Sequence, residues 1–283
     1  KCPYLITNYL GVKRMPELPE VETVRRGIEP HLIGEEVISI EVRNHKLRHP
    51  VPKEIEQFVG EEIQSVERRA KYLIIKGRRK QLIFHLGMSG VIRILLSGSE
   101  LKKHDHIIIA LSSGKSLIYN DPRRFGFLLI FDRDETPSFF SHLAPEPLSE
   151  QFTVEALWPK LRNRKRAIKT ILMDQEFVVG AGNIYANEAL FRAGIRPTRA
   201  ANRVTKKELT RLVSAVKAVL ARAIEEGGTT LKDFTTPDGH PGYFAQELAV
   251  YGQKDQPCVV CGEKIERIVL AQRATYFCKQ CQK

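Results

Sequence analysis

The chain has 283 residues, with 45 Lys or Arg against 33 Asp or Glu, so its formal net charge is +12. This length suggests about two domains and a core large enough to form without disulfides. No stretch approaches the roughly 18 uncharged apolar residues that a membrane-spanning helix needs, which excludes a protein anchored by one. The charge favours a polyanionic partner, nucleic acid first, although an ordinary basic soluble protein is an open alternative.

Two helical patterns stand out, far apart in the chain. Apolar residues at helical spacing predict a helix from about Pro19 that ends between Glu29 and Leu32. A T-x-x-E capping box and a long apolar stripe predict a second helix over 205–226, which the glycine pair after it would stop. The second helix belongs to a helical C-terminal half of the chain.

Short β-rich runs separated by turn signals fill residues 37–131, between these two helices. The runs are Val37–Val42, Ile63–Ile75, Gln81–Leu86, Val91–Leu96, Ile107–Leu111, Ser116–Tyr119 and Phe125–Phe131. Many short strands at close spacing predict an antiparallel sandwich or barrel. The turn-rich stretch 144–149 then reads as a linker into the helical half.

Four of the five cysteines lie within the last 26 residues, in the pattern C-x2-C-x16-C-x2-C. They are Cys258, Cys261, Cys278 and Cys281. Two such knuckles can place four thiolates around one Zn²⁺, whereas the alternative is a pair of disulfides in an oxidising compartment. No targeting segment indicates such a compartment, so we predict one closed, structural zinc site that stabilises a small hairpin.

Three further motifs bear on binding. The run 159–170 carries six basic residues and no acid, as expected of a surface that follows a nucleic-acid backbone, although such runs are usually solvated helix faces. The turn 121–126, DPRRFG, is either an ordinary hairpin tip or a wedge that fills the space of an extruded nucleotide. The stretch 179–185 lacks the third glycine of a dinucleotide fingerprint and instead predicts a turn that offers backbone N–H groups to a phosphate.

Together these motifs resemble the formamidopyrimidine-DNA glycosylase family, bacterial enzymes that remove 8-oxoguanine and ring-opened purines from DNA. The resemblance extends from Met15 to Lys283 and rests on MPELPEVET, RRAKYL, HLGMSG, KHDH, DPRRFG, GNIYANE, GGTTLKDF, GYFAQELAVYG and AQRATYFCKQCQK. It implies an α+β multidomain fold with an antiparallel β-sandwich and N-terminal helix (15–143), a helix-two-turns-helix domain (144–236) and a zinc-finger hairpin (237–283).

The resemblance also implies a bifunctional glycosylase and abasic-site lyase that acts in base-excision repair. Its nucleophile would be the amine of Pro16, exposed when Met15 is removed, and its Schiff base would lead to β,δ-elimination. A terminal amine titrates near about 8, so a useful neutral fraction exists at physiological pH. Glu17 would assist directly, Glu20 would support it, and the remaining catalytic residues would be Lys71 and Arg273.

The implied DNA contacts are spread over the chain. Met88, Arg123 and Phe125 would fill the vacated duplex space, with Arg123 facing the orphaned cytosine. The residues implied to contact phosphates, the flipped nucleotide or the damaged base are His104, Arg124, Lys165, Asn183 and Lys232. We expect double-stranded damaged DNA as the partner, one structural zinc as the cofactor, no membrane or nucleotide cofactor, a monomer, and a bacterial cytoplasmic location at the nucleoid.

Residues 1–14 depart from the family pattern. While they are attached, the Pro16 nitrogen is a tertiary amide and cannot attack a sugar. We therefore expect 1–14 to be a non-native or unprocessed extension, with Met15 as the true start. Two alternatives stay open: a relative of endonuclease VIII that prefers oxidised pyrimidines, and a DNA-binding protein without catalysis.

Overall fold

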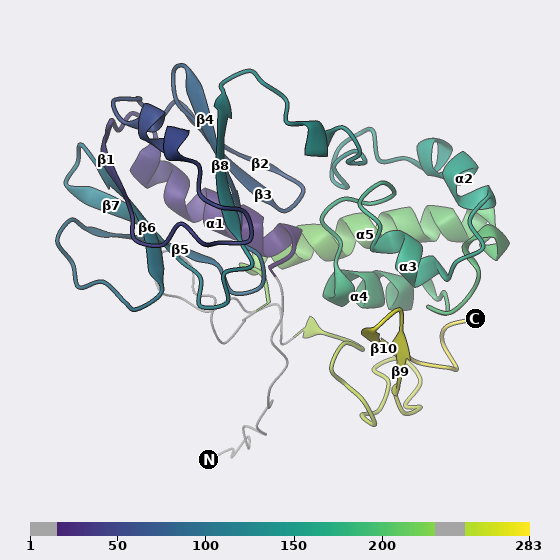
Figure 1. Ribbon diagram of the computed structural model, residues 1–283. Helices are drawn as coiled ribbons and strands as arrows, with labels where there is room; N and C mark the ends of the chain where they lie inside the picture. Colours follow the sequence, from purple (N-terminus) through teal and green to yellow (C-terminus); the bar gives the residue numbers. More distant parts are fainter. Residues whose placement is uncertain (1–15, 230–246) are drawn as a thin grey trace, which may run out of the picture.

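The computed structural model describes residues 16–229 and 247–283. Figure 1 shows a β-rich N-terminal half beside a helical C-terminal half, with a two-stranded hairpin below the helices. Helix α1 lies against strands of the first half and also contacts α5 of the second. No helix in the described ranges is long and apolar enough to cross a membrane.

The N-terminal half contains two four-stranded antiparallel sheets, in the orders β1-β6-β7-β5 and β2-β3-β4-β8. The elements are α1 (Leu18–Leu32), β1 (Val37–Val42), the 3-10 helix η1 (Lys53–Phe58), β2 (Ser65–Arg69), β3 (Tyr72–Lys76), β4 (Lys80–His85), β5 (Val91–Leu96), β6 (Asp105–Leu111), β7 (Lys115–Asn120), β8 (Phe127–Asp132) and the 3-10 helix η2 (Ser138–Phe140). Apolar side chains from both sheets and α1 form one core, which confirms the predicted sandwich with its N-terminal helix.

Two predicted strands have different limits in the structure. The run 63–75 is a hairpin rather than one strand, because β2 and β3 are joined by a tight turn at Ala70 (φ 54°). Alanine rarely adopts this left-handed conformation, so the composition of the turn gave no signal of it. The strand expected from Phe125 begins instead at Phe127, which leaves Phe125 in the preceding turn.

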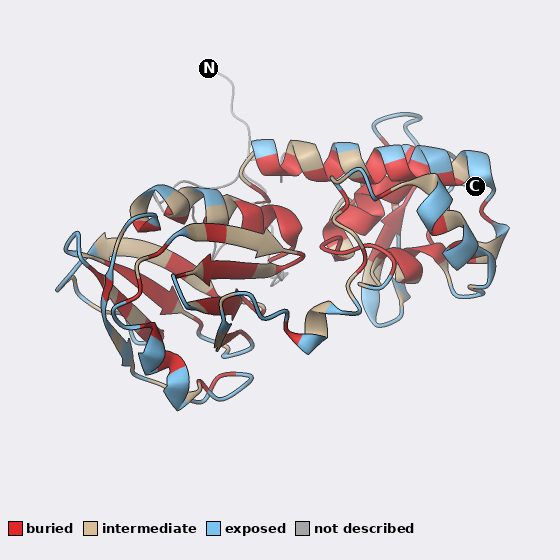
Figure 2. Cartoon of the chain, turned by 90° about the horizontal axis from the view of Figure 1, so that it is seen from above, coloured by how far each residue is buried: buried red, intermediate tan, exposed pale blue. Residues whose placement is uncertain are grey.

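The C-terminal half is helical and ends in the hairpin. Its elements are α2 (Val154–Arg162), α3 (Ile168–Leu172), α4 (Asn183–Ala193), the 3-10 helix η3 (Ala201–Arg203), α5 (Lys206–Glu225), β9 (Glu266–Leu270) and β10 (Arg273–Phe277). The expected capping box at the start of α5 is present, and Figure 2 shows α5 buried on one face and exposed on the other. A second core joins these helices to side chains of the hairpin, including Tyr276 and two of the cysteines.

Candidate active site and nucleic-acid interface

The start of α1 lies where the two halves of the molecule meet. Pro16 and Glu17 are buried there, and the Leu18 backbone N–H donates to the Gly180 carbonyl at 3.2 Å. The Glu17 backbone N–H donates to the Glu20 carboxylate at 2.9 Å, which closes the first turn of the helix. The N-terminal Pro-Glu pair is therefore held by contacts from both halves.

The Glu17 carboxylate occupies the N-terminus of α4. It is 3% exposed and accepts hydrogen bonds from the backbone N–H groups of Gly182 (2.7 Å) and Ile184 (3.2 Å). A Cβ on Gly182 would lie 2.3 Å from the Glu17 carboxyl carbon, so only glycine permits this approach. The expectation that this turn binds a phosphate is wrong for these two N–H groups, because a side-chain carboxylate already takes them.

Burial dominates the electrostatics of this junction. It raises the pKa of Glu17 to about 7, against the attraction of nearby Lys71 and the two backbone hydrogen bonds. Lys71, at the tip of the β2–β3 hairpin, is 9% exposed, and burial lowers its pKa although Glu17 and Glu20 favour its charge. The exposed Arg273, at the start of β10, lowers the pKa of Lys71 further. The structure therefore brings Lys71 within electrostatic range of two other predicted catalytic residues, Arg273 and Glu17, and Glu17 directly follows Pro16.

Lys169 joins this cluster, although its sequence context suggested a solvated surface. It is 1% exposed, and its Nζ donates to the Ala274 carbonyl (3.0 Å) and to Thr275 Oγ1 (2.6 Å). Burial and the charge of Arg273 lower its pKa to about 7, against attraction from Glu17. The available signal was the apolar sequence around it in α3, which indicates a buried helix.

Glu20 links three elements at the same junction. Its Oε1 accepts hydrogen bonds from the Tyr185 hydroxyl (2.6 Å) on α4 and from the Thr229 backbone N–H (3.0 Å) and hydroxyl (2.9 Å) after α5. Sequence reasoning gave Glu20 a supporting role and did not identify Tyr185 or Thr229. These contacts fix the orientation of the first turn of α1 relative to the helical half.

A network of ion pairs holds the hairpin that carries Lys71. Glu146, from the segment between the two halves, accepts hydrogen bonds from Arg68 (2.6 Å), Arg69 (2.9 Å) and the backbone N–H of Ala70 (2.7 Å). The last bond supports the left-handed conformation of Ala70. Because these groups are partly buried, the network is better shielded from water than a surface ion pair. It therefore holds the hairpin that carries Lys71 to the segment between the two halves.

The predicted wedge residues lie on two adjacent loops. Met88 is half-buried in the loop after β4, and Phe125, in the loop before β8, is 45% exposed. The guanidinium of Arg123 lies 4.8 Å from the centre of the Phe125 ring. A Cβ on Gly87 would lie 2.4 Å from the Gly126 nitrogen, so the two loops are in direct backbone contact. The structure thus places the three residues on two loops that touch each other.

The other predicted DNA contacts are more dispersed. His104 and Arg124 line one cavity of about 370 Å³ together with Arg43 and Lys103. Lys165 is exposed in the loop between α2 and α3, and Lys232 lies outside the described residues.

Asn183, another predicted DNA contact, is the first residue of α4. It donates to the Ala274 carbonyl at 3.1 Å, while its buried Oδ1 has no hydrogen-bond partner among the described residues.

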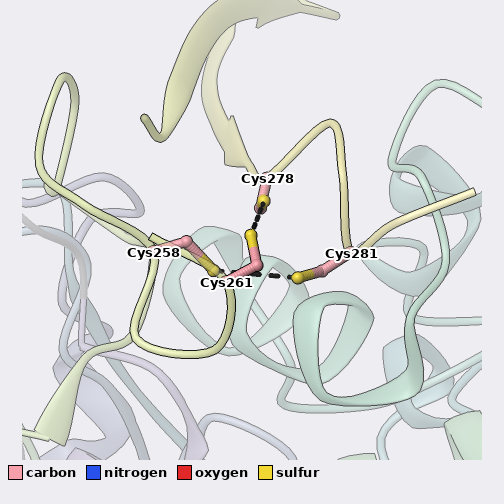
Figure 3. A group of neighbouring side chains, drawn as sticks. All are labelled: Cys258, Cys261, Cys278 and Cys281. Atoms are coloured by element: carbon pink, nitrogen blue, oxygen red, sulfur yellow. Dashed lines mark hydrogen bonds between the residues drawn. The ribbon is translucent and has the colours of Figure 1, made fainter. Parts of the chain in front are cut away.

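The four predicted zinc ligands converge at the base of the hairpin (Figure 3). Their sulfur atoms all lie within 4.8 Å of one another, and none forms a disulfide. The Sγ atoms of Cys258 and Cys281 are 3.8 Å apart, and those of Cys261 and Cys278 are 3.5 Å apart. Tetrahedral zinc with Zn–S bonds of about 2.3 Å needs sulfur separations of about 3.8 Å, so the cluster fits one Zn²⁺.

Replacement of Glu17 by Gln should change how stability depends on pH. The pKa of Glu17 is about 7 in the folded protein, against a usual value of 4.5. The stability that its proton contributes is therefore complete below pH 4.5 and lost as the pH rises through 7. Relative to the unsubstituted protein, Glu17→Gln should gain up to about 3 kcal/mol in free energy of unfolding over this range. Urea unfolding of both proteins at about pH 4 and pH 8 measures this gain. A difference in free energy of unfolding that is the same at both pH values would contradict the prediction.

Three family models match consecutive parts of the chain. They are described as the formamidopyrimidine-DNA glycosylase N-terminal domain (residues 15–128), the formamidopyrimidine-DNA glycosylase H2TH domain (residues 143–235), and a zinc finger found in FPG and IleRS (residues 255–283). The formamidopyrimidine-DNA glycosylase of Proteus mirabilis is 56% identical over 268 residues, which cover 95% of this chain and 98% of that protein.

Solved structures agree with these matches. A complex of Lactococcus lactis Fpg with DNA that contains an abasic site has a TM-score of 0.89 and 34% identity, and the match covers 94% of this chain and 99% of that one. A complex of the wild-type Lactococcus lactis enzyme with DNA that contains an oxidised pyrimidine has a TM-score of 0.87 and 35% identity, with coverage of 95% and 100%.

The sandwich and the helical half, which meet at the Pro-Glu pair, and the four-cysteine hairpin packed on the helices define a zinc-finger DNA glycosylase of base-excision repair. The chain belongs to the formamidopyrimidine-DNA glycosylase family.

Proposed function

We propose that this protein excises oxidised purines, such as 8-oxoguanine and formamidopyrimidines, from duplex DNA and then cleaves the abasic site. The observation that carries the proposal is the buried Pro16–Glu17 pair with Lys71, Lys169 and Arg273 around it. Perturbed carboxylates and amines collected at one junction are typical of an acid–base site. Such a site would act on the anionic backbone that the net charge of +12 attracts.

The proposed chemistry begins at the Pro16 nitrogen once it is a free secondary amine. Its lone pair forms a bond to the sugar C1′, the glycosidic bond breaks, and the base leaves with a proton. The nitrogen then loses its own proton, and the C1′–O4′ bond breaks as O4′ takes up a proton, which opens the sugar ring and leaves an iminium. The resulting iminium withdraws electrons, so a proton is lost from C2′ and the 3′-phosphate departs in β-elimination. Loss of a further proton expels the 5′-phosphate in δ-elimination.

Neighbouring groups would move the protons. Glu17, with a pKa of about 7, exists in both protonation states near neutral pH and can therefore accept and return a proton. Lys71 would donate a proton or hold a phosphate during β-elimination, and Arg273 would assist δ-elimination. While Met15 is attached, the Pro16 nitrogen is an amide, so the active form would begin at Pro16.

The proposed interface contacts the strand that carries the lesion and the space in the duplex that the flipped nucleotide has vacated. Met88, Arg123 and Phe125 would fill the gap, with Arg123 facing the orphaned cytosine. The groups that would contact phosphates or the flipped nucleotide are His104, Arg124, Lys165 and Asn183, with Lys232 near the damaged base. The complex of the Lactococcus lactis relative with abasic-site DNA supports this proposal.

The proposed organisation keeps the expected boundaries. A catalytic sandwich would span 15–143, a helix-two-turns-helix domain 144–236 and the zinc finger 237–283, preceded by the extension 1–14. We further propose that the protein acts as a monomer in the bacterial cytoplasm, at the nucleoid.

Lesion preference tests the proposed substrate class. We expect protein that begins at Pro16 to release 8-oxoguanine at least about tenfold faster than thymine glycol from otherwise identical duplexes. A pocket that forms hydrogen bonds to one base rejects another base, because the wrong base leaves buried polar groups of the pocket without partners. Single-turnover excision measures both rates. The oxidised-pyrimidine complex of a relative makes the comparison necessary. Faster release of thymine glycol would favour an endonuclease VIII-like preference instead.

A further inference from the structure

One buried carboxylate, that of Asp121, lies between the two loops of the proposed wedge. Asp121 follows β7 directly and is 0% exposed. Its Oδ1 accepts hydrogen bonds from the Ser89 hydroxyl (2.5 Å) and the Arg123 backbone N–H (3.3 Å). Its Oδ2 accepts from the Gly126 backbone N–H (2.8 Å) and the Tyr119 hydroxyl (3.2 Å). Four donors thus converge on a single side chain.

Three of these donors belong to the wedge loops themselves. Ser89 follows Met88, and Arg123 and Gly126 stand on either side of the exposed segment that contains Phe125. The Ser89 hydroxyl also accepts a hydrogen bond from the Arg123 backbone N–H at 3.2 Å, so it connects the two loops directly. The fourth donor, Tyr119, lies in the sandwich core and is in neither loop.

The loops have little freedom to rearrange. A Cβ on Gly87 would lie 2.4 Å from the Phe125 carbonyl carbon, so the two backbones already touch. Arg124 has a φ of 57°, which is costly for a residue with a side chain and requires support from its surroundings. That support includes the Arg124 N–H bond to the Asp121 carbonyl at 3.1 Å.

Only a carboxylate satisfies this arrangement. Each of its oxygens accepts two hydrogen bonds, whereas an asparagine would turn an NH₂ group toward donors and leave some of them unpaired in a buried place. A carboxylate that accepts from neutral donors on two loops is suited to hold both in one geometry.

We propose that Asp121 is a positioning residue that fixes Met88, Arg123 and Phe125 as one rigid wedge. This inference rests on the proposed function, in which those side chains enter the duplex where a nucleotide has left it. A rigid wedge would insert without first losing loop entropy, so it would unstack the neighbouring bases more completely.

The test compares two hydroxyl donors to the same carboxylate. Ser89→Ala removes the donor that connects the loops, and Tyr119→Phe removes the core donor as a matched control. The probe is a duplex with a tetrahydrofuran abasic analogue opposite cytosine and 2-aminopurine next to that cytosine. Its fluorescence at saturating full-length, zinc-loaded protein reports unstacking. The readout needs no catalysis and therefore no free Pro16 amine.

We expect the unsubstituted protein to raise the fluorescence, Ser89→Ala to reduce that rise by about half or more, and Tyr119→Phe to retain it. Asp121→Asn should reduce it at least as far as Ser89→Ala, and Phe125→Ala marks the loss of the wedge itself. Equal effects of Ser89→Ala and Tyr119→Phe, or none from either, would overturn the positioning role alone. No rise with the unsubstituted protein would instead overturn the proposed wedge, and the inference with it.

Discussion

Protein that begins at Pro16 should form a covalent adduct with an 8-oxoguanine duplex when borohydride is present, and the full 283-residue chain should form none. Borohydride reduces a Schiff base, and only a free amine can form one at C1′. In the full chain the Pro16 nitrogen is an amide, which blocks the attack. Denaturing electrophoresis and peptide mass mapping of the adduct measure this result.

The site of the adduct separates the remaining possibilities. Lys169 is the main competing amine, because its pKa is lowered to about 7 and it lies close to Glu17. An adduct on a lysine in both forms would show that the proline mechanism is wrong for this protein. Duplex binding without any adduct, in a sample proven to begin at Pro16, would indicate a DNA-binding protein without catalysis.

Replacement of Cys258 by Ser should abolish measurable duplex binding while the N-terminal sandwich stays folded. Cys258 belongs to the four-cysteine cluster that fits one Zn²⁺ and to the core that joins the hairpin to the helices. A structural zinc site contributes its binding free energy to folding, with an apparent value of about 10 kcal/mol or more in isolated fingers. The sandwich core contains none of the hairpin residues, so we expect it to survive. Zinc content measures the loss of the metal site, duplex affinity measures the loss of binding, and hydrogen exchange of the sandwich shows whether that domain stays folded.

Cys2→Ser is the matched control, because Cys2 lies outside both C-x2-C knuckles. This variant should keep its zinc and its affinity for DNA. Unchanged affinity of Cys258→Ser in a sample shown to be free of zinc would contradict the predicted role of the hairpin. Loss of the sandwich in the same variant would contradict the independence of the two cores.

Much of the local structure was predictable because it depends on neighbouring residues. Cysteine spacing predicted the zinc cluster, the T-x-x-E box predicted the start of α5, and alternating apolar runs predicted most strands. The hairpin at Ala70 was not predictable in this way. Its left-handed turn depends on Glu146, which lies 76 residues further along the chain.

The sequence by itself determined the family, the order of the three modules and the zinc ligands, because these follow from motifs and spacings within short segments. Only the tertiary structure decided that the N–H groups at the start of α4 bind Glu17 rather than a phosphate. It also decided that Lys169 is buried and that Asp121 connects two loops. Burial and long-range hydrogen bonds arise from packing between distant segments, so no local pattern specifies the pKa values or contacts that make these residues important.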